Sequence, residues 1–170
     1  MPAPRTRPAH DADEKTQLLG WLDLQRSVIH WKAEGLSDTD AHRAVLPHSP
    51  LMTMAGLVSH LRWTEHLWFE VVLEDHPSDA NPQFADEPED ADMLVDGVPL
   101  AELLARYDEQ CAVTDHLVAQ HSLDDLSRHP AIHPGTNLRW LLLHMLEETA
   151  RHAGHADAIR ELLDGNRGYY

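Results

Sequence analysis

Residues Leu141 to Leu163 read LLLHMLEETARHAGHADAIRELL, and this stretch decides the fold. Its apolar residues recur at every third or fourth position, which predicts a helix. At about 100° per residue, one side of that helix carries His144, Glu148, His152 and His155. Leucine and isoleucine share the same stripe, so it faces the core, where an unpaired charge is costly. These four side chains are therefore candidate metal ligands.

Glu148 and His152 are the strongest pair, because a Glu-x-x-x-His spacing on one helix can chelate a single divalent ion. A facing helix is predicted at 53–74, TMAGLVSHLRWTEHLWFEVVLE, with His60 in the middle of its apolar stripe. Adding His60 makes a site of two histidines and one carboxylate, with water completing the shell. Such donors suit Zn²⁺, and Ni²⁺, Fe²⁺ and Mn²⁺ fit them as well.

Spacing alone leaves other interpretations open. A single histidine such as His60 on an apolar face is often a hydrogen-bonded core residue. Glu148 could pair with Arg151 or face solvent near a bundle end. His152 and His155 would lie on the surface if their helix extends past the core.

The chain as a whole predicts an all-α four-helix bundle spanning residues 11–166, with long crossover connections. No segment shows the alternation or the turn residues of paired strands. Residues 1–10 are expected to be a disordered leader, and residues 167–170 a short tail. The predicted helices are 11–34, 53–74, 99–121 and 136–164, with a short helical turn at 38–43.

Capping residues mark the ends of these helices. Asp11 or Asp13 is expected to cap the first helix, Thr53 the second and Thr136 the fourth. Gly165 suits the end of the fourth helix.

The connection at 75–96 is long, rich in proline and strongly acidic. It is too polar to belong to the core. Two interpretations remain open: a solvated crossover, or a lid over a functional site.

Composition excludes several functions. A net charge of −16 argues against nucleic-acid binding and against an anionic membrane surface. The N-terminus has no secretory h-region, and no run approaches the about 20 apolar residues of a membrane span. Cys111 is the only cysteine, so an intramolecular disulfide is excluded and a reducing, cytoplasmic location is expected. Its place on an apolar stripe makes Cys111 a core residue rather than a nucleophile.

The five tryptophans are many for 170 residues. Either all belong to the core or at least one lies at an interface. We expect a homodimer.

Two segments, GLVSHLRWTEHLWFEVVLED and LRWLLLHMLEETARHAGHADAIRELLDG, resemble the DinB-like (YfiT/DinB) superfamily. The resemblance is closest to its actinobacterial branch, which includes mycothiol-dependent enzymes, and spans about Leu18 to Gly165. It implies a four-helix bundle around a divalent metal held by His60, Glu148 and His152. Many members use three histidines. The glutamate here is similar instead to the His-Glu-His zinc set of mycothiol-dependent maleylpyruvate isomerase.

The resemblance also implies a metal-dependent enzyme of the thiol S-transferase type, or a related hydrolase or isomerase. A low-molecular-weight thiol such as mycothiol would be the cosubstrate and would attack a small electrophile. His155 and His144 would then be catalytic candidates that face substrate or relay a proton. The alternative is a non-catalytic metal-binding or stress-response bundle that acts as a binding or dimerisation module.

Overall fold

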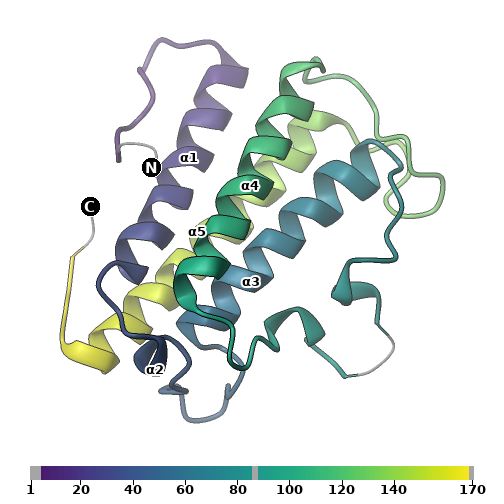
Figure 1. The fold of residues 1–170 in the computed structure, drawn as a ribbon. Helices are drawn as coiled ribbons and strands as arrows, with labels where there is room; N and C mark the ends of the chain where they lie inside the picture. Colours follow the sequence, from purple (N-terminus) through teal and green to yellow (C-terminus); the bar gives the residue numbers. More distant parts are fainter. Residues whose placement is uncertain (1–4, 86–87, 169–170) are drawn as a thin grey trace.

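The computed structural model of the protein describes residues 5–85 and 88–168. Four long helices lie side by side (Figure 1): α1 (Glu14–Ala33), α3 (Met54–Glu65), α4 (Leu100–Ala119) and α5 (Leu138–Asp164). A π-helix, η1 (His66–Leu73), continues α3. The connections carry the short helix α2 (Asp38–Ala41) and two 3₁₀ turns, η2 (Pro82–Phe84) and η3 (Ala91–Met93). Between residues 5 and 168, leaving out 86–87, β structure is limited to an isolated bridge between Leu126 and Asn137.

The bundle contains the crossover that the connection lengths predict. In Figure 1, α3 and α4 run in the same direction, and α1 and α5 run together in the opposite one. Contacts at the helix ends agree: Arg139 at the start of α5 pairs with Glu14 at the start of α1, and His121 just after α4 pairs with Glu74 just after η1. The connection 74–99 must therefore return along the length of the bundle, which carries it past the middle of α3.

The apolar stripes of the helices meet in one continuous core. Its large members are almost completely excluded from solvent, and they include Leu22, Ile29, Leu57, Leu61, Phe69, Tyr107, Leu138, Leu141, Met145 and Ile159. Burial of this apolar surface is the main driving force for folding. In the described part of the chain, no helix is both long enough and apolar enough to cross a membrane.

One buried ion pair joins three helices inside this core. The Arg26 guanidinium of α1 donates to both carboxylate oxygens of Glu65 on α3, at 2.8 and 2.7 Å. It also donates to Asp115 on α4 at 2.8 Å. The Cys111 thiol lies 3.5 Å from Glu65, on the packed face where the sequence predicts it. Burial, followed by the nearby charge of Glu65, raises the pKa of Cys111 far above its ordinary value, so the thiol stays protonated.

Two helix caps agree with the sequence and one differs. Asp13 accepts a hydrogen bond from the Thr16 amide, and Thr53 accepts one from the Gly56 amide. The predicted cap at Thr136 is wrong, because the Thr136 carbonyl accepts from the Ser127 amide in the bridging segment. Asn137 caps α5 instead, and its side chain accepts from the Trp140 amide at 3.0 Å. Gly165 ends α5 with φ of 75°, as expected.

The second predicted helix changes type near its middle. The α-helical geometry ends at Glu65, and residues 66–73 continue as a π-helix that buries Trp68, Phe69 and three further residues. An apolar pattern does not distinguish the two helix types, because it reports burial rather than the hydrogen-bond register.

The two ends of the described chain lie against α1. Residues 5–10, expected to be disordered, place the Arg5 guanidinium 4.0 Å from the Trp31 ring centre and Pro8 against Gly20. The tail also packs there, since the Gly168 carbonyl accepts from Lys32 at 2.8 Å. Residues 1–4 of the leader and 169–170 of the tail lie outside the described residues.

Candidate metal centre

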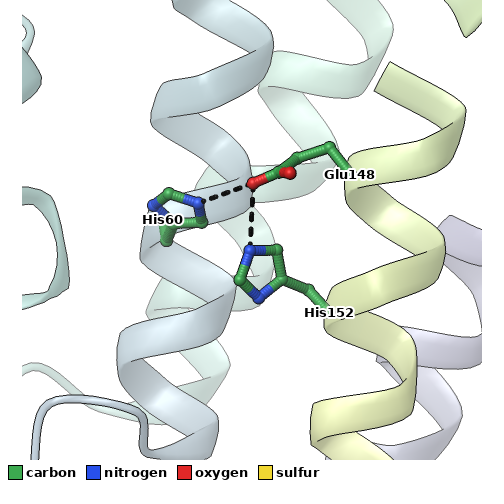
Figure 2. Close-up of side chains that lie close together, drawn as sticks. All are labelled: His60, Glu148 and His152. Carbon is green, nitrogen blue, oxygen red and sulfur yellow. Dashed lines mark hydrogen bonds and ion pairs between the residues drawn. The ribbon is translucent and has the colours of Figure 1, made fainter. Parts of the chain in front are cut away.

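His60 on α3 meets Glu148 and His152 on α5 (Figure 2). The Nε2 atom of His60 lies 3.2 Å from Oε1 of Glu148, and Nε2 of His152 lies 3.0 Å from the same oxygen. One ligand atom from each residue can be chosen so that all three lie within 4.8 Å of one another. The four-residue spacing on α5 and the packing of α3 against α5 create this arrangement, as the sequence predicts.

The three side chains are largely buried, but each keeps some exposure to solvent. The exposed fractions of the His60, Glu148 and His152 side chains are 19%, 14% and 9%. A small ligand can therefore reach them from one side, while the bundle supports them from the other.

The carboxylate and the histidines shift each other's protonation. Burial alone would lower the pKa of His60, but hydrogen bonds and charges from Asp92 and Glu148 outweigh it and raise the pKa to about 9. Hydrogen bonds from His152 and then His60 hold the pKa of Glu148 far below its ordinary value. Without a metal, the site is thus an anionic carboxylate stabilised by imidazole N–H groups.

This donor set fits a divalent ion. Two imidazole nitrogens and one carboxylate oxygen are suitable ligands for Zn²⁺, and three protein ligands leave a position for water or substrate. The two Nε2 atoms already face the same carboxylate oxygen. A cation there would replace the protons that these rings now donate to Glu148.

Each histidine of the cluster has a partner on its other nitrogen. Nδ1 of His60 lies 2.6 Å from Oδ2 of Asp92, which belongs to η3. Nδ1 of His152 lies 3.3 Å from Nδ1 of His155. Partners of this kind fix the ring orientation of metal-binding histidines. His155 therefore joins the cluster, behind His152.

Asp92 is a residue that sequence reasoning missed. The acidic connection was expected to be too polar for the core, yet Asp92 is 4% exposed and Asn81 is 2% exposed. Burying Asp92 is tolerated because its carboxylate accepts from His60 and from Gln83. Only one weak feature of the sequence points to burial here: Asp92 lies between apolar Ala91 and Met93 in an otherwise acidic segment.

The structure places His144 in an aromatic cluster instead. Its ring stacks on Trp140 with centroids 5.0 Å apart and meets Trp68 edge-on at 4.6 Å. The His133 ring also stacks on Trp140, with ring centroids 5.7 Å apart. Trp140 is 42% exposed and Trp68 is 8% exposed, so the tryptophans are not all core residues. The homodimer stays a prediction.

Two cavities meet at His60. The first, of about 550 Å³, reaches His60, Glu148 and His152, and its other walls are His48, Ser49, Pro50, Leu51, Met52, Glu89, Asp90 and Met93. The second, of about 480 Å³, is lined by His60, Pro82, Gln83, Ala85, Pro88, Glu89, Asp90, Ala91 and Asp92. Neither His144 nor His155 is among the described residues that line these two cavities. Residues 89–93 of the crossover thus separate the metal-facing side of His60 from the side held by Asp92.

Comparisons with known proteins identify the family to which this chain belongs. A crystal structure of a conserved protein from Enterococcus faecalis matches with a TM-score of 0.67 and 17% identity, covering 91% of this chain and 99% of that chain. At this identity the likeness shows the fold alone. Among curated proteins, nothing matches. The family model of the mycothiol-S-transferases matches residues 17–165, which include α3, α4 and α5, all of α1 except its first three residues, and the His60–Glu148–His152 cluster. The chain therefore belongs to the mycothiol-S-transferase family of DinB-like bundles.

Proposed function

We propose that this protein is a metal-dependent thiol S-transferase that joins a mycothiol-type thiol to a small electrophile. The observation that carries the proposal is the convergence of His60, Glu148 and His152 within 4.8 Å in a chain of the mycothiol-S-transferase family. A divalent metal, most suitably Zn²⁺, would be held by these three side chains. When bound, such an ion lowers the pKa of a coordinated thiol and so makes thiolate available near neutral pH.

The chain's own residues would bind and orient the reactants. The first cavity leads to the three ligands, and the part of its wall formed by Leu51, Met52 and Met93 is apolar. An electrophile with an apolar body would pack on this wall and exclude water from the reacting atoms. Cys111 takes no part, because its thiol is buried beside Glu65 and stays protonated.

The transfer itself balances without an oxidant or reductant. The thiol loses its proton, its sulfur forms a bond to the electrophilic carbon, and the leaving group departs with the electron pair of the broken bond. His48 lines the same cavity, and a neutral imidazole there can accept the thiol proton. The products are a thioether, the leaving anion and a proton.

The test is thiol consumption by the zinc-loaded protein with mycothiol and a bimane or chlorodinitrobenzene electrophile. We expect turnover in the wild type and its loss in His152→Ala and Glu148→Ala. Glu147→Ala is the matched control, because Glu147 is the neighbouring carboxylate on α5 and pairs with Arg151 on the exposed side. Equal rates in the wild type and His152→Ala would contradict the proposal.

A further inference from the structure

Asp92 is a buried carboxylate that lies outside the candidate ligand set. It lies in η3 of the acidic crossover, where its neighbours Glu89 and Asp90 are exposed, yet it is itself 4% exposed. A buried carboxylate is costly unless hydrogen-bonded donors stabilise it. Its position therefore depends on specific partners.

Three side chains donate hydrogen bonds to Asp92. Oδ2 accepts from Nδ1 of His60 at 2.6 Å and from Nε2 of Gln83 at 2.9 Å. The Asp92 carbonyl accepts from the Ser59 hydroxyl at 2.5 Å. The Gln83 amide also donates to the Thr64 hydroxyl at 3.1 Å. Gln83 and Asp92 of the crossover are thereby attached to three residues on two turns of α3.

The hydrogen bond to Asp92 determines which nitrogen of His60 has a lone pair available to bind a metal. A carboxylate accepts only, so Nδ1 must carry a proton. In the neutral ring, the lone pair is then on Nε2, the atom that faces Glu148 at 3.2 Å. That is the tautomer a histidine needs to donate to a metal from this position.

The two histidines of the cluster are held by unlike partners. His60 bonds to a carboxylate over 2.6 Å, whereas His152 meets another imidazole, His155, over 3.3 Å. An ionised partner makes a shorter and stronger hydrogen bond than a neutral one. The ring of His60 is accordingly the more firmly oriented of the two.

We propose that Asp92 is a positioning residue for metal binding, which acts through Nδ1 of His60 and makes the acidic crossover a structural part of the metal centre. This inference rests on the proposed metal site. It gives the crossover a role that neither a solvated connection nor a mobile lid requires: its buried carboxylate prepares a ligand that belongs to another element.

The main test is the zinc affinity of wild type, Asp92→Ala and Asp96→Asn, measured by competition with a chromophoric chelator. Asp92→Ala should weaken zinc binding by about 10- to 100-fold, the usual effect of losing such a partner. Asp96→Asn is the matched control. It removes an exposed carboxylate of the same crossover that lines neither of the two cavities, and it should change the affinity by less than about threefold, as expected for an exposed charge. Wild-type affinity in Asp92→Ala would overturn the proposal.

A second readout depends neither on metal nor on the folding of Asp92→Ala. In ¹⁵N-labelled wild type, Nδ1–H of His60 should give a downfield, slowly exchanging proton resonance that His60→Ala removes. Absence of that resonance would overturn the role of Asp92. Failure of the wild type to bind zinc while the resonance is present would instead count against the proposed metal site, so the two failures are distinguishable.

Discussion

Zinc binding at the candidate centre should strengthen steeply with pH between 7 and 9. Asp92 and Glu148 outweigh the burial of His60 and raise its pKa to about 9 in the metal-free protein. A histidine must lose its second proton before it can bind a metal. Lowering the pH below 9 therefore makes protons compete with zinc for Nε2 of His60.

The expected size follows from this pKa. At pH 7, two units below about 9, roughly 1 in 100 rings is deprotonated, so the apparent affinity is about 100-fold below its high-pH limit, or about 2.7 kcal/mol. From pH 7 to 8 the affinity should rise about tenfold. With an ordinary histidine pKa near 6.5, the same step would raise it by less than about twofold. Glu148 does not add to the change of zinc affinity with pH, because its lowered pKa keeps it ionised between pH 7 and 9.

The same shift has the opposite effect on the metal-free fold. Because the pKa of His60 is raised on folding, its stabilising contribution is fully present below the unfolded value of about 6.5. That contribution is lost as pH rises through about 9. Zinc-free protein should thus lose unfolding free energy over the pH range in which zinc affinity increases.

The assay is chelator competition at pH 7.0, 7.5 and 8.0, with calorimetry in buffers of different ionisation enthalpy to count released protons. His155→Ala is the control. Burial lowers the pKa of His155, so the ring is neutral here and its removal should leave the slope unchanged. A change of less than twofold between pH 7 and 8 would refute the raised pKa of His60 and the electrostatic account of the cluster.

Three further predictions concern other parts of the molecule. Arg26→Met should destabilise the fold by about 3–5 kcal/mol in urea unfolding, because it leaves Glu65 buried without its cation; a cost below 1 kcal/mol would contradict the pairing. Cys111 should resist a disulfide reagent at pH 8 until the protein unfolds, since its raised pKa suppresses the thiolate; rapid labelling of native protein would show otherwise. After correction for the uncatalysed rates, the protein should prefer neutral iodoacetamide to anionic iodoacetate by roughly tenfold, because Glu89 and Asp90 line the cavity. Glu89→Gln should narrow that preference, and equal rates would rule out charge selection.

Helical periodicity predicted the bundle and made His60, Glu148 and His152 candidate ligands, and the family resemblance then favoured them as one metal-binding set. The Glu148–His152 spacing determines which face of α5 they share, and the apolar stripe around His60 directs that ring toward the same core. Both features are local, so they can be derived from residues a few positions apart. The crossover was also expected from the lengths of the connections.

What could not be predicted depends on contacts between distant segments. Asp92 reaches His60 from 32 positions away, through a connection without a regular repeat. The π-helical geometry after Glu65 depends on the hydrogen-bond register, which an apolar pattern does not encode. His144 shares the stripe of Glu148, but Trp68 and Trp140 lie around its ring. The spacing of residues along one helix predicts which way a side chain points. The residues that it contacts come from other parts of the fold.

The central claim is that His60, Glu148 and His152 hold one divalent metal ion. Elemental analysis of the purified protein, dialysed after exposure to zinc, tests it most directly. The account predicts about one ion per chain in the wild type and in Glu147→Ala, and loss of the ion in His152→Ala. A wild type without bound metal, or a His152→Ala protein that keeps its full complement, would contradict it.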